Sequence, residues 1–283
     1  MKKRLLTAAA LVFAAVLFYA NFTSAADVFP LWPDVAPGAA SVDKKPTYEY
    51  WKPENQTSDA CVIVFPGGAY EYLTLGRDAK QLTRFFNERG VTVVVLNYRV
   101  PRPKNGPKHL PAWQDAQRVI RVVRSRAAEW GLDPEKIGAL GLSAGGHLTL
   151  MAATSSQTAA YEPVDAVDKL PCHLNFAVPV YPAYVLEDGA NGPNANRGFD
   201  SPMVDDFAFD DKTPPMCLLH GDADAYSPNG SVAVYAQLRK MGVPAELHIY
   251  ANVPHGFVGN PSSGKPVDTW LERVDAWRKK MGF

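Results

Sequence analysis

The fold is decided by the stretch Lys136-Ile137-Gly138-Ala139-Leu140-Gly141-Leu142-Ser143-Ala144-Gly145-Gly146-His147-Leu148. Residues 136–140 read as a short buried strand and residues 147–153 as an apolar helix. Between them lies the pattern Gly-x-Ser-x-Gly, centred on Ser143. A serine on so sharp a turn has a strained backbone, and its neighbours must lack side chains to avoid collision. Its hydroxyl is then exposed beside a helix N-terminus, where developing negative charge is stabilised.

Apolar segments alternate with amphipathic ones on both sides of this stretch, which indicates an α/β fold. Continuous apolar strands separated by helices imply a mostly parallel, doubly wound central sheet covered by helices on both faces. An extended arm near residues 29–33 and an edge strand at residues 48–51 are expected before it. The predicted strands are 60–65, 91–97, 136–140, 174–180, 216–220 and 245–250, and the predicted helices are 78–89, 113–130, 147–153, 231–241 and 267–280.

The first 26 residues have the pattern of a signal peptide. A basic start at residues 2–4 precedes a nearly continuous apolar run over residues 5–20, and small residues follow at 23–26. The alternative is an uncleaved membrane anchor, although the run falls short of the roughly 20 residues needed to span a bilayer. We expect cleavage near Ala25 or Ala26, export to the periplasm or the medium, and no stable membrane insertion afterwards.

Residues 27–283 are expected to form one catalytic domain. Without the three basic residues of the leader, 26 basic residues face 29 acidic ones, which argues against a nucleic-acid partner. The three cysteines Cys61, Cys172 and Cys217 have no metal-ligand spacing, and the sequence leaves open whether two of them form a disulfide. No dinucleotide or phosphate-binding motif is present, so no cofactor or metal is expected. A long polar segment at 181–215 interrupts the strand–helix alternation and is interpreted as a partial lid.

A serine nucleophile needs a base that takes its proton and an acid that holds the base. When the serine comes first along the chain, the acid and then the histidine follow on loops after strands. His255 follows the last predicted strand on a turn-prone loop and is the predicted base, whereas His147 is interpreted as a packed helix residue. The acid comes from the loop after residues 216–220, where both Asp222 and Asp224 qualify by residue type. We favour Asp224, because it lies further into the loop, and expect Asp222 to shape the turn.

The intermediate formed by attack on an ester carbonyl needs amide donors aimed at its oxyanion. Ala144, directly after the serine, supplies one predicted donor. The glycine-rich loop after residues 60–65 supplies others at Gly68 and Ala69. An ordinary glycine turn is the alternative there, and the serine motif in the same predicted sheet favours the oxyanion role.

Five segments, in this order along the chain, resemble the α/β-hydrolase family: Pro66–Tyr70, Asn97–Arg99, Gly141–His147, His220–Asp224 and His255–Phe257. Four others resemble the exported bacterial acetylxylan and related carbohydrate esterases within it: Pro30–Pro33, Leu96–Pro101, Asp115–Arg118 and Val123–Ala127. The chain departs from many members of the family in the oxyanion loop, where Pro66 and Ala69 replace a histidine and a third glycine.

This resemblance implies a serine carboxylic-ester hydrolase without cofactor, which removes short acyl groups such as acetyl from xylan-type carbohydrate through an acyl-enzyme. Tyr70, Tyr72 and Tyr181 are candidates for stacking against a sugar, while Arg99 and Asp115 are interpreted as structural. A general short-chain carboxylesterase remains an alternative, as does a catalytically idle carbohydrate-binding protein. A prolyl-oligopeptidase-type peptidase would need a propeller, for which too few residues precede the first predicted buried strand. The acyl group, the sugar and the oligomeric state stay open.

Overall fold

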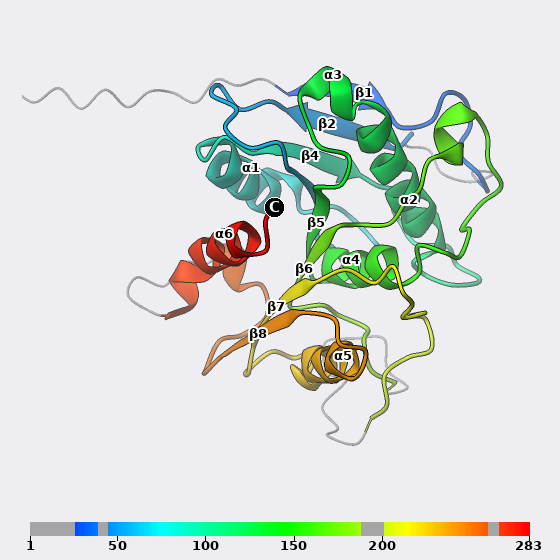
Figure 1. The fold of residues 1–283 in the computed structure, drawn as a ribbon. Helices are drawn as coiled ribbons and strands as arrows, with labels where there is room; N and C mark the ends of the chain where they lie inside the picture. Colours follow the sequence, from blue (N-terminus) through cyan, green and yellow to red (C-terminus); the bar gives the residue numbers. More distant parts are fainter. Residues whose placement is uncertain (1–25, 39–44, 188–200, 260–265) are drawn as a thin grey trace, which may run out of the picture.

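The computed structural model describes residues 26–38, 45–187, 201–259 and 266–283. The predicted signal peptide therefore lies almost wholly outside the described residues. Within them, eight strands form one sheet in the order β1-β2-β4-β3-β5-β6-β7-β8, with helices on both faces (Figure 1). From β4 to β8 all neighbouring strands are parallel, while β1 and β2 join antiparallel. The predicted doubly wound α/β architecture is confirmed.

The strands are β1 (Asp27–Pro30), β2 (Thr47–Trp51), β3 (Cys61–Phe65), β4 (Thr92–Asn97), β5 (Ile137–Leu142), β6 (Phe176–Val180), β7 (Met216–Gly221) and β8 (Ala245–Tyr250). The α-helices are α1 (Lys80–Asn87), α2 (Leu110–Ser125), α3 (Ala127–Trp130), α4 (Ala144–Thr154), α5 (Asn229–Lys240) and α6 (Trp270–Lys280). Short helical turns lie at Leu75–Ala79, Ala166–Lys169, Phe257–Gly259 and Pro266–Thr269.

Alternate residues of the central strands build two hydrophobic cores, one on each face of the sheet. On β3, Ile63 and Phe65 join the core beneath α2, α4 and α5. Val62 and Val64 join the opposite core, beneath α1 and α6. This two-sided burial explains why the central strands are apolar at every position, since a strand covered on both faces has no solvent side.

Two elements differ from the sequence prediction. The edge strand is β1, and the segment predicted to be the edge is β2, which lies between β1 and β4. Pro30 suits an edge because it has no amide to donate to a further strand. The predicted helix 113–130 is divided at Arg126, whose backbone leaves the helical region, and α3 then ends at Gly131 in the left-handed conformation.

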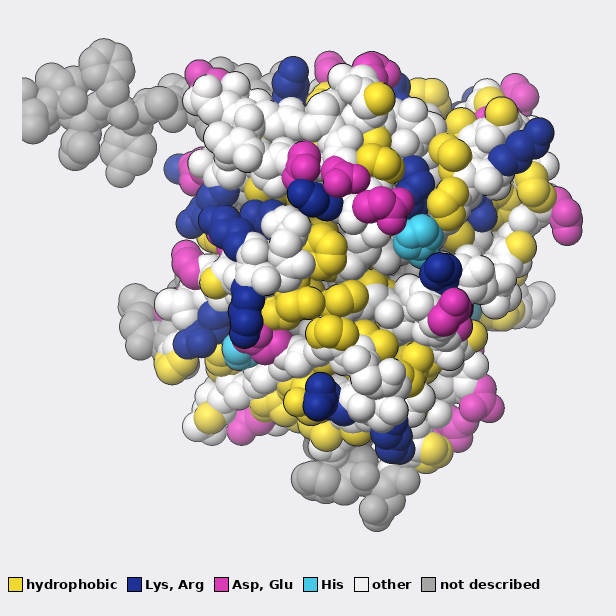
Figure 2. Space-filling view, viewed as in Figure 1, with side chains coloured by type: hydrophobic (Ala, Val, Ile, Leu, Met, Phe, Trp, Pro, Cys, Tyr) yellow, Lys and Arg dark blue, Asp and Glu magenta, His cyan; other side chains and the backbone are white. Residues whose placement is uncertain are grey.

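The predicted site residues lie at the carboxyl ends of the parallel strands. Ser143 directly follows β5, Tyr181 follows β6, and the loops after β7 and β8 carry Asp224 and His255. This edge is where open α/β sheets bind ligands. On the face seen in Figure 2, basic and acidic side chains are interspersed rather than gathered by sign. No helix among the described residues is long and apolar enough to cross a membrane.

Candidate active site

Ser143 occupies a strained turn between β5 and α4. Its backbone has φ 57° and ψ −116°, a combination that non-glycine residues rarely adopt. The two motif glycines permit the turn because other backbone atoms pack where their side chains would be. A Cβ on Gly141 would lie 2.0 Å from the carbonyl oxygen of Gly145, and one on Gly145 would lie 2.0 Å from that of Phe65. The predicted Gly-x-Ser-x-Gly turn is therefore sterically restricted to glycine at both positions.

A continuous chain of hydrogen bonds joins Ser143, His255 and Asp224. The Ser143 Oγ lies 2.8 Å from His255 Nε2, and His255 Nδ1 lies 2.7 Å from Asp224 Oδ2. Because an ionised carboxylate only accepts, Nδ1 carries the proton and Nε2 is free to accept from the serine hydroxyl. The His255 side chain is 27% exposed, whereas that of Asp224 is fully buried. The structure thus places the predicted nucleophile, base and acid in hydrogen-bonding order.

The Asp224 carboxylate is held ionised by its surroundings. Burial acts to raise its pKa, but hydrogen bonds from His220 and His255 outweigh burial and lower the pKa below its usual value. The amide of Tyr226 also donates to Oδ1 at 2.8 Å. The sequence alone did not assign this role to His220. Its Nε2 donates to the Tyr226 carbonyl oxygen and lies 3.5 Å from Asp224 Oδ2.

Asp222 has a different place in the same loop. Its carboxylate accepts a hydrogen bond from the Asn252 amide, and its own amide donates to the Tyr250 carbonyl. These contacts tie the loop after β7 to the loop that carries His255. Asp222 therefore shapes the turn, as the sequence suggested for whichever aspartate was not the orienting acid.

The glycine-rich loop after β3 lies against the elbow. A Cβ on Gly67 would lie 3.4 Å from Ser143 Cβ, and one on Gly68 would lie 1.9 Å from the Tyr72 carbonyl oxygen. Gly68 has φ 127°, and Ala69 follows in the left-handed region with φ 56°. Ala144 begins α4, so its amide has no acceptor within the helix. Gly68, Ala69 and Ala144 thus lie on the two backbone segments that adjoin Ser143.

The comparisons with known proteins agree with this geometry. A family model described as BD-FAE matches residues 49–183. The solved structure of an acetyl ester-xyloside bifunctional hydrolase from Caldicellulosiruptor lactoaceticus superposes with a TM-score of 0.74 at 29% identity, covering 91% of this chain and 97% of that one. The chain has the α/β-hydrolase fold. Esterase 2 of Thermogutta terrifontis, at 24% identity and a TM-score of 0.72 over 91% of this chain and 95% of that one, has the same fold.

Two curated relatives of this chain are esterases. An acetylxylan esterase of Xylanibacter ruminicola is 28% identical over 85% of this chain and 49% of its own length. Esterase LipQ of Mycobacterium tuberculosis is 29% identical over 69% of this chain and 48% of its own. The chain therefore spans about half the length of these relatives, and the predicted resemblance to serine esterases such as acetylxylan esterases is confirmed.

Aromatic rings lie beside the His255 imidazole. The rings of Tyr181 and Tyr226 both lie 4.9 Å from it between centroids. Tyr181 is 2% exposed and Tyr70 has no exposed surface, so in this structure neither offers a free ring face to a sugar. Tyr72 is 61% exposed, and its role in stacking against a sugar stays a prediction.

Other polar residues hold the scaffold. Arg99 and Asp115 form a buried ion pair at 3.0 Å, as interpreted from the sequence, and Trp32 Nε1 donates to the same carboxylate. Burial raises the pKa of Asp115, and Arg99 offsets part of that rise. All three cysteines lie in the described part of the chain and are buried free thiols there.

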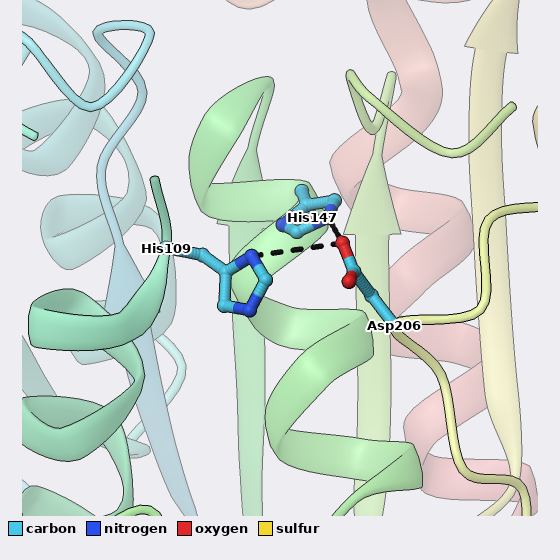
Figure 3. A group of neighbouring side chains, drawn as sticks. All are labelled: His109, His147 and Asp206. Atoms are coloured by element: carbon cyan, nitrogen blue, oxygen red, sulfur yellow. Dashed lines mark ion pairs between the residues drawn. The ribbon is translucent and has the colours of Figure 1, made fainter. Parts of the chain in front are cut away.

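One cluster was not foreseen: His109, His147 and Asp206 converge beside α4 (Figure 3). His147 is fully buried, as expected for a packed helix residue, and its Nδ1 lies 2.9 Å from the Tyr70 hydroxyl. His109 precedes Ser143 along the chain, so the order of a serine-first triad gave it no predicted role. The three residues are too far apart in the chain for any spacing motif to connect them.

Proposed function

We propose that the protein is a carboxylic-ester hydrolase that removes short acyl groups, in particular acetyl, from xylan-type polysaccharide or its fragments. The observation that carries this proposal is the hydrogen-bonded order Ser143–His255–Asp224 at the carboxyl edge of the sheet. Similarity to an acetylxylan esterase and to an acetyl ester-xyloside hydrolase supports the substrate class. Similarity to other esterases supports a general short-chain carboxylesterase as the second candidate.

In the proposed reaction, Ser143 Oγ attacks the ester carbonyl carbon while His255 Nε2 accepts the hydroxyl proton. The carbonyl oxygen becomes an oxyanion stabilised by backbone amides of Gly68 or Ala69 and of Ala144. His255 returns the proton to the sugar oxygen as the carbon–oxygen bond breaks, which releases the alcohol and leaves an acyl-serine. A water molecule, deprotonated by His255, then attacks the acyl carbon. His255 passes the proton to Ser143 Oγ as the acyl–serine bond breaks, which releases the carboxylic acid and restores the serine. Asp224 stabilises the imidazolium in both halves.

Release of carboxylic acid from a panel of substrates tests the proposal. Acetylated xylan, a feruloylated oligosaccharide, short-chain aryl esters and peptide amides should be supplied at matched concentration. We expect acetate from acetylated xylan at the highest rate among the natural substrates, and no cleavage of amides. Aryl-ester hydrolysis without acetate release from xylan would favour the general carboxylesterase. Xylan binding without release of any acid would favour the idle carbohydrate-binding protein.

We also propose that residues 27–283 form one catalytic domain, that segment 181–215 acts as its partial lid, and that residues 1–26 direct export and are removed. Residues 188–200 of the segment lie outside the described structure. Its described parts are joined by a bridge between Leu186 and Met203. Mass spectrometry of exported protein should show a chain that begins near Ala26 or Asp27, whereas an intact Met1 in the membrane fraction would establish an anchor.

A further inference from the structure

The cluster of His109, His147 and Asp206 joins three separate parts of the fold. His109 immediately precedes α2, His147 lies in the first turns of α4, and Asp206 belongs to the segment between β6 and β7. In Figure 3 the three side chains point toward one another. The Asp206 Oδ2 lies 3.6 Å from His109 Nδ1 and 3.9 Å from His147 Nε2. These distances are within ion-pair range but exceed ordinary hydrogen bonds, so hydrogen bonding does not explain the arrangement.

Both imidazole nitrogens that face the cluster are buried polar atoms without a hydrogen-bond partner among the described residues. They are His109 Nδ1 and His147 Nε2. His147 has no exposed surface, and His109 is 6% exposed. Because a buried polar atom without a partner is destabilising, two of them aimed at one point need an explanation. Burial also lowers the pKa of both histidines, which favours the neutral imidazole.

We propose that His109 Nδ1, His147 Nε2 and the Asp206 carboxylate bind a divalent transition-metal cation, with Zn²⁺ as the fitting ion. All three ligand atoms lie within 4.8 Å of one another. A tetrahedral zinc ion would hold such atoms about 3.3 Å apart, since its bonds to nitrogen and oxygen are about 2.0–2.2 Å long. The Asp206 side chain is 41% exposed and can rotate toward the ion. The two imidazole nitrogens come closer only through a small shift of the His109 ring, since His147 is fully buried.

The surroundings favour this ion in two ways. When His147 Nε2 binds metal, Nδ1 carries the proton and donates to the Tyr70 hydroxyl oxygen, which orients the imidazole. A cavity of about 730 Å³ borders His109 and Asp206 and leaves space for a water molecule at a fourth position. We therefore expect imidazole-preferring cations to bind, and Mg²⁺ and Ca²⁺ to fail.

Such an ion would connect the segment between β6 and β7 to the nucleophile helix. The Asp206 segment is already anchored to the far end of α4, because the Ser155 hydroxyl donates to the Asp206 carbonyl and accepts from the Ala208 amide. The metal would add a second attachment, near the start of α4. Its role is thus structural, and Ser143, His255 and Asp224 need no metal for the chemistry proposed above.

Titration calorimetry of untagged full-length protein, stripped with EDTA and supplied with ZnCl₂, tests the proposal. We expect one strongly bound zinc per chain and a rise in Tm with zinc. His109→Gln and Asp206→Asn should each weaken binding by at least about tenfold, since each removes a ligand. His248→Gln is the matched control, because His248 forms a surface histidine–carboxylate pair with Glu246 at 3.0 Å. It should bind zinc as the unaltered protein does.

The same variants distinguish the proposed site from other zinc sites. Melting in EDTA first establishes that both ligand variants fold. Co²⁺ bound to the unaltered protein should give the visible absorption of a four- or five-coordinate ion, and Asp206→Asn should lose that absorption. Unchanged zinc affinity in both ligand variants, or the absence of strong zinc binding by the unaltered protein, would overturn the proposal.

Discussion

The position of Ser143 is fixed by hydrogen bonds to α4, to the end of β6 and the segment after it, and to the His255 side chain. The Ser143 amide donates to the Val180 carbonyl, its carbonyl accepts from the His147 and Ala183 amides, and its hydroxyl meets His255. These bonds over-determine a backbone conformation that is unfavourable by itself. The hydroxyl is consequently held in place before any substrate arrives, and its reactivity depends on the histidine.

We expect Ser143→Ala and His255→Ala each to reduce kcat by at least about 10³-fold, because the members of such a unit act together. Steady-state kinetics on an aryl acetate, with circular dichroism to verify folding, measures this effect. His248→Ala removes a histidine from β8 outside the site and should retain full activity. A folded Ser143 or His255 variant with more than about a tenth of the original activity would refute their assignment.

Substitutions of the two neighbouring aspartates should have very different effects on kcat. Asp224→Asn removes the charge that orients His255 and stabilises its imidazolium, so we expect a loss of about 10⁴-fold in kcat. Asp222→Asn loses part of an exposed contact to the Asn252 amide and should cost far less activity. Parallel kinetics on both purified variants make the comparison, and the reverse ranking would identify Asp222 as the orienting acid.

Residue identity and order were enough to predict Ser143 and His255, because the nucleophile motif and the loop after the last strand are local features. They favoured Asp224 over Asp222 without excluding Asp222, since both lie on one loop and the choice depends on how that loop curves. His220 could not be assigned its contact for the same reason. The cluster of His109, His147 and Asp206 depends on the packing of α2 and the segment before β7 against α4, which no spacing in the chain encodes.

Among the elements, α2 is fastened to the sheet by the buried carboxylate of Asp115. The Asp115 carboxylate accepts hydrogen bonds from the Arg99 amide, the Arg99 guanidinium and the Trp32 indole. The Arg99 guanidinium also donates to the Pro37 and Pro111 carbonyls. This network joins the N-terminal segment, the loop after β4 and α2. Its members come from separate regions of the chain, which is why the sequence indicated a structural role without identifying these contacts.

We expect Asp115→Ala to lower the free energy of unfolding by about 3–5 kcal/mol, because it leaves the Arg99 guanidinium buried without a counterion. Urea denaturation followed by circular dichroism measures the loss. Asp59→Ala is the control: Asp59 pairs with Lys136 at the surface, where an ion pair contributes about 1 kcal/mol or less. Equal effects of the two substitutions would contradict a stabilising role for the buried pair.

The element boundaries were predictable where a periodic pattern met a glycine, as at α3 and Gly131. Strand order and helix breaks were less predictable, because contacts between distant segments decide them. β2 reads as an edge because its residues alternate in polarity, yet β1 covers its outer side. Within α2 and α3, the apolar spacing continues across Arg126, so nothing in the pattern marks the break.

For the whole molecule, the bulky residues around the triad predict selectivity for short acyl groups. Tyr181, Tyr184 and Phe257 are all nearly buried, and Tyr181 packs against both His255 and Phe257. An open apolar pocket would gain about 0.8 kcal/mol for each buried methylene, whereas a closed one excludes longer chains. We expect kcat/KM to be highest for the acetate of an aryl-ester series and to fall from butyrate to octanoate. A maximum at hexanoate or beyond would instead indicate a lipophilic-ester carboxylesterase.

Two of the buried free thiols can serve as probes of local opening between the sheet and the helices on each of its faces. Cys61 on β3 belongs to the core beneath α2, α4 and α5, and Cys217 on β7 belongs to the core beneath α1 and α6. Burial raises the pKa of both thiols, which disfavours the reactive thiolate. A thiol-specific reagent therefore reacts with either cysteine only after local opening exposes it. The labelling rate at each cysteine, read by peptide mass, would therefore report separately on the loosening of each helical layer from the sheet.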